Sequence, residues 1–194
     1  GAGREVGSEL VVAPEVKAVG FTGSLAGGMA LFQLANNRPE PIPVFAEMGS
    51  VNPVVLLPEA LEQNAEAIAA GFVGSLTLGV GQFCVNPGVA VAIQSPALDR
   101  FCAAASAALA KVPAGVMLNE GIAAAYQKGT AHLSAQSGVE LVGSGEAVGD
   151  KAGFCTQAKL FKVTAEAFLA NPHLQEEVFG HVSVLVSCAD QAQL

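Results

Sequence analysis

One cysteine, Cys84, lies in a setting that would suit covalent chemistry. Gly81 and Gln82 come shortly before it, and the sequence Asn-Pro-Gly follows at 86–88. Small residues and a turn leave space for a substrate beside a thiol that could act as a nucleophile. A lone cysteine can equally be a small hydrophobic residue of the core. Taken alone, Cys84 leaves both interpretations open.

The remaining cysteines and the histidines favour structural or surface roles. No Cys-x-x-Cys pair occurs, and no histidine lies at metal-ligand spacing from a cysteine, so we expect no metal site. Four separated thiols in a chain of this length are typical of a reduced, cytoplasmic protein. The residues concerned are Cys102, Cys155, Cys188, His132, His173 and His181.

Glu47 is a second candidate for chemistry. It ends an apolar run that predicts a strand from Val44 to Glu47. Flanking Phe45 and Met48 would partly desolvate its carboxylate, as suits a general base. An exposed glutamate at the end of a strand is the alternative.

A third candidate is the sequence Phe-Thr-Gly-Ser at 21–24, followed by Gly28. It predicts a strand, a turn of small residues and the start of a helix, whose free backbone N–H groups suit a phosphate. An ordinary strand-to-helix turn has the same pattern. It is not a Walker loop, because no Gly-Lys-Ser/Thr follows.

The elements that would position these residues alternate between strand and helix. This alternation predicts an α/β fold with a mostly parallel sheet. We expect strands at 16–21, 44–47, 53–57, 89–93, 139–142, 160–163 and 182–186, and helices at 25–36, 59–79, 99–111 and 119–136.

The helix expected at 59–79 has one continuous apolar face. Its second half carries no charge, so we expect it to be buried nearly all round and to deliver residues 81–84 to the interior. The apolar face comprises Leu61, Ala65, Ile68, Phe72 and Leu76.

Composition limits the classes of partner. Hydrophobic residues make up 52% and charged residues 13%, which excludes a disordered chain. The net charge of −8 argues against binding to nucleic acid or to an anionic membrane surface. The uncharged stretch 67–98 is interrupted by glycines and favours a buried helix, turn and strand over a membrane span.

Four motifs in order carry a family resemblance. They are Phe-Thr-Gly-Ser at 21–24, Glu-Met-Gly-Ser at 47–50, Gly-Gln-Phe-Cys at 81–84 and Glu-Glu-Val-Phe-Gly at 176–180. In this order they resemble the aldehyde dehydrogenase superfamily over essentially the whole chain. The stretch 38–53 is most similar to the branch that oxidises α-ketoglutarate semialdehyde.

The resemblance implies two domains. Residues 1–48 would be a remnant of the nucleotide-binding domain, its last βαβ unit, and residues 49–194 a catalytic domain that is incomplete at its C-terminal end. It also implies that the chain by itself is inactive, because other parts of the cofactor site would lie outside it.

Roles for single residues follow from the same resemblance. Cys84 would attack the aldehyde, forming a thiohemiacetal and then a thioester, with its own N–H in the oxyanion hole. Glu47 would activate the water that releases the acid. The cofactor, NADP or NAD, would contact four residues: Gly23 and Ser24 at the pyrophosphate, Glu177 at the ribose and Phe179 near the nicotinamide.

The resemblance further implies a small aldehyde as substrate and a homodimer or homotetramer. The sequence departs from the family pattern at Ser50, usually glycine, and at His181, commonly proline. Two other classes remain as alternatives, a thiol acyltransferase and a non-catalytic assembly module.

Overall fold

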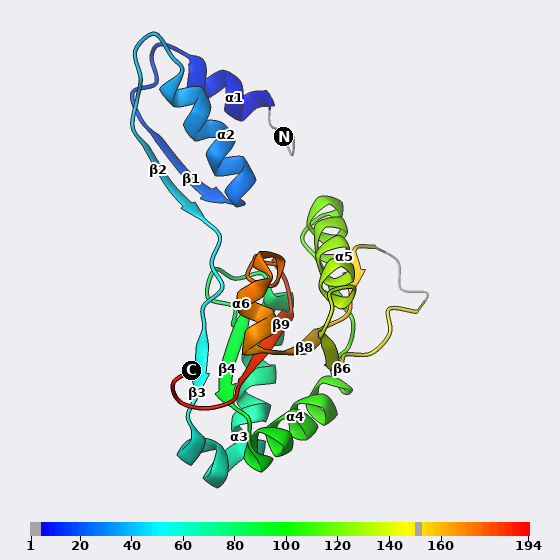
Figure 1. Cartoon of the computed structure of the whole chain (residues 1–194). Helices are drawn as coiled ribbons and strands as arrows, with labels where there is room; N and C mark the ends of the chain where they lie inside the picture. The colour runs from blue at the N-terminus through cyan, green and yellow to red at the C-terminus, as the bar shows by residue number, and fades with distance from the viewer. Residues whose placement is uncertain (1–4, 150–152) are drawn as a thin grey trace. The chain divides into compact units, whose positions relative to one another are not determined.

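The computed structural model describes residues 5–149 and 153–194, and the chain divides into two compact units, Gly1–Gly49 and Ser50–Leu194 (Figure 1). The predicted domains 1–48 and 49–194 meet beside this division, and the first four residues of the former lie outside the described part. The nucleotide-binding and catalytic roles of the two domains stay predictions.

The first unit is built around two parallel strands joined by a helix. Met48 on β2 lies against this helix, α2, at Gly28, where an added Cβ would come within 2.1 Å of the Met48 sulfur. The buried Arg38 side chain donates to the carbonyls of Val11 and Val16, at 2.9 Å each. The elements are α1 (Glu5–Val12), β1 (Val19–Gly23), α2 (Leu25–Asn36) and β2 (Val44–Met48).

The second unit contains a five-stranded sheet in the order β3-β4-β9-β8-β6. The first four strands are mutually parallel and β6 is antiparallel, so the predicted α/β fold with a mostly parallel sheet is confirmed. The strands are β3 (Val54–Leu56), β4 (Val89–Ile93), β9 (Val182–Cys188), β8 (Lys159–Thr164) and β6 (Glu140–Ser144).

Helices cover both faces of this sheet. Leu185 of β9 packs in one cluster with α3 and α4, whereas Val184 and Val186 pack in another with α5. This alternation follows from the two-residue period of a strand. The helices are α3 (Pro58–Thr77), α4 (Pro96–Leu109), α5 (Glu120–Ser134) and α6 (Ala165–Ala170). Shorter elements are η1 (Leu78–Gly81), η2 (Pro172–Leu174) and the antiparallel pair β5 (Gly115–Val116) and β7 (Cys155–Thr156).

The expectation for the second half of α3 is wrong. Phe72 and Leu76 are buried, but Gly71, Gly74 and Ser75 are exposed. The helix packs with one face against α4 and the sheet, and its small residues form the uncovered face. No helix within residues 5–149 and 153–194 is long and apolar enough to cross a membrane.

Candidate active site

The segment before Cys84 has an unusual backbone. Gly79, Val80 and Gly81 all have left-handed φ angles, of 55°, 61° and 66°. This conformation is strained for the β-branched Val80. A Cβ on Gly81 would lie 2.4 Å from the backbone of Gly180, so glycine is required there for contact as well as for conformation.

Cys84 lies in an exposed turn. The Asn86 N–H donates to the Phe83 carbonyl at 3.1 Å, which makes Cys84 and Val85 the central residues. Both Phe83 and Cys84 are exposed. The expectation that residues 81–84 enter the interior is therefore wrong beyond Gly81, because the chain turns outward once Gly81 has packed against residue 180.

Two distant segments hold the Cys84 turn. The Ser50 hydroxyl and the Asn52 amide each donate to the Cys84 carbonyl at 2.6 Å. On the other side, the Asn86 amide donates to the Gly180 carbonyl at 3.0 Å. The turn is thus contacted by Ser50, the last residue of the motif at 47–50, and by Gly180, the last residue of the motif at 176–180.

A small hollow lies beside this turn. It is lined by residues on either side of Cys84 and by the 176–180 segment, among them Phe83, Asn86, Glu177 and Phe179. Glu177 and Phe179 are exposed. The structure therefore brings two of the four expected cofactor residues next to the Cys84 turn.

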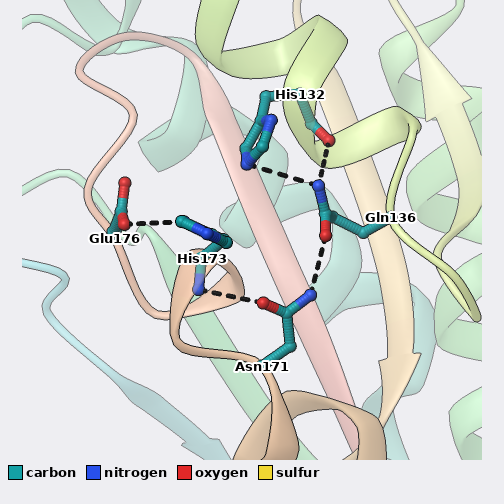
Figure 2. Close-up of polar contacts among 5 residues, drawn as sticks. All are labelled: His132, Gln136, Asn171, His173 and Glu176. Atoms are coloured by element: carbon teal, nitrogen blue, oxygen red, sulfur yellow. Dashed lines mark hydrogen bonds and ion pairs between the residues drawn. The ribbon is translucent and has the colours of Figure 1, made fainter.

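A chain of polar contacts anchors the segment that leads to Glu177 (Figure 2). Just after α5, the Gln136 amide donates to the carbonyl of His132 in the last turn of that helix at 3.0 Å and accepts from the Asn171 amide at 2.8 Å. Asn171 in turn accepts from the His173 N–H, and the His173 ring lies 2.9 Å from the Glu176 carboxylate. Sequence reasoning missed this network because its two halves are 35 residues apart.

A buried polar group lies directly after Gly180. His181 is 1% exposed, and burial lowers the pKa of its imidazole to about 4, so the ring is neutral near pH 7. Its Nε2 lies 2.9 Å from the Thr156 hydroxyl. The ring also lies against Tyr126, whose hydroxyl donates to the Gln157 carbonyl and whose pKa is raised by burial.

The other three site predictions fall in the first unit, at the carboxyl ends of two adjacent strands. Gly23 is paired with Met48 and Thr22 with Glu47. Ser24 caps α2, its Oγ accepting from the Gly27 N–H at 3.2 Å. Glu47 is exposed, so the expected partial desolvation is wrong: alternation along β2 turns its side chain away from the α2-covered face that holds Met48.

The remaining thiols differ from Cys84. Burial raises the pKa of Cys102, with Asp99 adding to the shift and Lys162 opposing it, and burial also raises the pKa of Cys188. Cys155 is buried. Within the described part of the chain, no three histidine, cysteine or acidic side chains are grouped so as to hold a metal ion.

Comparison with known sequences gives close relatives. The chain is 57% identical over 190 residues to alpha-ketoglutaric semialdehyde dehydrogenase 2 of Azospirillum brasilense, a match that covers 98% of this chain. It is 45% identical over 193 residues, 99% of this chain, to the alpha-ketoglutaric semialdehyde dehydrogenase of Acinetobacter baylyi. It spans 36% of the length of each relative.

Solved structures share the fold. An NAD-dependent benzaldehyde dehydrogenase from Corynebacterium glutamicum matches with a TM-score of 0.77 at 23% identity, over 100% of this chain and 41% of that one. A 1-pyrroline-5-carboxylate dehydrogenase matches with a TM-score of 0.80 at 20% identity, over 100% and 38%. The pattern of the aldehyde dehydrogenase family matches residues 1–194, and the chain belongs to this family.

Proposed function

We propose that the chain serves in the NAD(P)-dependent oxidation of an aldehyde to a carboxylic acid. The substrate is a semialdehyde such as α-ketoglutarate semialdehyde. The observation that carries this proposal is the identity of 57% and 45% to two enzymes named for that substrate, over nearly the whole chain.

Cys84 is the nucleophile in this proposal. Its sulfur forms a bond to the aldehyde carbon, and the carbonyl oxygen becomes an oxyanion that the Cys84 N–H helps to stabilise. Loss of hydride from that carbon leaves a thioester. Glu47 removes a proton from water, which attacks the thioester, releases the acid and returns the thiol. The exposure of the Cys84 turn supports this role, since an aldehyde must reach the sulfur.

The residues expected at the cofactor fit a dinucleotide. The first turn of α2 carries no acidic residue that would repel an anion. The positive end of the helix dipole therefore favours a pyrophosphate beside Gly23 and Ser24. The Glu177 carboxylate can accept from ribose hydroxyls, and the exposed Phe179 ring can pack against the nicotinamide. NADP or NAD, when bound, supplies the acceptor for the hydride.

The proposed cofactor and catalytic residues also give each domain a role. Residues 1–48 belong to the nucleotide-binding domain and residues 49–194 to the catalytic domain. A cytoplasmic location and a homodimer or homotetramer complete the proposal.

A chimera tests the function. The 190 aligned residues of the Azospirillum relative are replaced by this chain, and aldehyde-dependent NAD(P)H formation is measured. We expect turnover by the chimera and a loss of about 1000-fold or more on Cys84→Ser. Glu47→Gln should slow steady turnover while a first equivalent of NAD(P)H still forms, because hydride leaves before water attacks. Cys102→Ser is the matched control and should retain activity.

The proposal fails if Cys84→Ser turns over like the parent chimera. The unfused chain is assayed alongside, since its inactivity stays a prediction.

A further inference from the structure

The Cys84–Val85 peptide is the central peptide of the turn from Phe83 to Asn86. In such a turn the closing bond joins the first and last residues and leaves the central peptide unbound. Turns of types I and II differ by a rotation of about 180° of this central peptide, so the closing bond alone does not fix where the Cys84 carbonyl points.

Two side chains fix that carbonyl. The Ser50 hydroxyl and the Asn52 amide converge on it at 2.6 Å each. The Asn52 amide also donates to the Asn86 carbonyl at 3.1 Å and lies 3.0 Å from the Ser50 oxygen. These contacts tie both the centre and the end of the turn to residues 50–52.

Residues 50–52 are themselves held by the sheet. The Val51 carbonyl accepts from the N–H groups of Gly88 and Val89, at 2.9 and 3.2 Å, where β4 begins. Asn52 has a left-handed φ of 41°, a conformation that asparagine tolerates better than most residues. The backbone between the two donors is therefore hydrogen-bonded to the start of β4.

We propose that Ser50 and Asn52 are positioning residues for the Cys84 thiol, an inference that rests on the proposed nucleophilic role of Cys84. By binding the Cys84 carbonyl they set the direction of the central peptide. In a planar trans peptide, a carbonyl turned toward Ser50 and Asn52 sends the Val85 N–H the opposite way. They also partly offset the partial negative charge of a carbonyl that belongs to the same residue as the sulfur.

The rate of Cys84 alkylation tests the proposal. The 194-residue chain is treated with iodoacetamide over a series of pH values, and the labelled Cys84 is measured by mass spectrometry. Ser50→Ala and Asn52→Gly each remove a donor without adding a charge and should slow alkylation by about 3- to 10-fold, the range expected for one hydrogen bond. Both should also move the midpoint of the pH dependence upward. Ser50→Thr keeps the hydroxyl and should restore the parent rate.

The matched control is Ser95→Ala. Ser95 caps α4, its Oγ accepting from the Leu98 N–H at 3.2 Å. The variant therefore also loses one hydrogen bond between a serine hydroxyl and the backbone, far along the chain from residues 50–52. It should alkylate at the parent rate. In the chimera, Ser50→Ala should lower kcat while leaving the KM for aldehyde within about 2-fold.

Equal rates and equal pH midpoints in the parent, Ser50→Ala and Asn52→Gly would overturn the positioning role and leave the proposed function standing. Full turnover by the Cys84→Ser chimera would overturn the proposed function instead. Circular dichroism checks each fold, and Asn52→Gly, which tolerates the left-handed φ of residue 52, decides the matter if Ser50→Ala does not fold.

Discussion

At the scale of single residues, Gly81 tolerates a side chain poorly for two separate reasons. Its φ is 66°, and an added Cβ would meet backbone atoms of Gly180 and His181 at 2.4 Å. Gly81→Ala should lower the free energy of unfolding by about 2–4 kcal/mol. Gly74→Ala on α3, where nothing lies within 4 Å, should raise it by about 0.5–1 kcal/mol. Urea denaturation measures both, and equal effects would contradict the prediction.

His181 makes stability depend on pH. The unfolded imidazole takes up a proton near pH 6.5, but the buried ring does so only near pH 4. Between these values the unfolded state binds more protons, so the free energy of unfolding falls as the pH drops from 6.5 to 4. His181 contributes a slope of at most about 1.4 kcal/mol per pH unit.

His181→Gln should flatten this slope, and His132→Gln, at an exposed position, should not. Urea denaturation at pH 7, 6, 5 and 4.5 gives the slopes. Parallel curves for the parent and His181→Gln would show that another group carries the dependence.

At the scale of elements, the contacts between α5 and residues 171–176 should order the segment that carries Glu177. Asn171→Ala removes both its bond to Gln136 and its bond to the His173 N–H. Amide hydrogen exchange in residues 172–180 should become faster by about 5-fold or more. Gln127→Ala, at an exposed position of α5, is the control. Unchanged exchange in Asn171→Ala would contradict the claim that the network orders this segment.

Elements with a strong local signal could be predicted from the sequence. The helix 25–36 and the strand 89–93 have the predicted bounds, and Asn119 caps α5 by accepting from the Ile122 N–H. The short helices α1 and α6 were not predicted, since neither is long enough to show a helical period. Nor could the antiparallel direction of β6 be read from its residues, because pairing is decided by the partner strand.

The candidate site shows the same limit more sharply. Cys84 and its neighbours carry a local motif, and resemblance placed it among the other motifs. The hold of Ser50 and Asn52 on the Cys84 carbonyl could not be predicted, because it depends on a turn 34 and 32 residues further along the chain. The exposure of Cys84 depends likewise on where Gly81 packs.

At the scale of the whole molecule, each hydrophobic cluster formed by residues 5–149 and 153–194 lies within one unit. Two clusters draw only on residues after 50, and the third is small and draws only on residues before 45. Residues 50–194 expressed alone should therefore unfold in one cooperative transition, with Cys84 alkylated at the rate seen in the 194-residue chain. Residues 1–49 alone should be largely unfolded, since so small a core does not offset the loss of chain entropy.

Circular dichroism and urea denaturation of the two segments measure this. A non-cooperative transition of residues 50–194 would contradict the prediction.

The strand order of the second unit has a consequence for folding. β9 is the middle strand of its sheet, yet it comes latest in the chain among the five (Figure 1). During synthesis, β4 and β8 are therefore made before β9 and expose the edges that β9 later pairs with. A strand with an unpaired edge aggregates readily. The bond from Asn86 to residue 180 spans 94 positions, and such distant contacts form slowly. The Cys84 turn should accordingly become ordered late, once the sheet has closed on its middle strand.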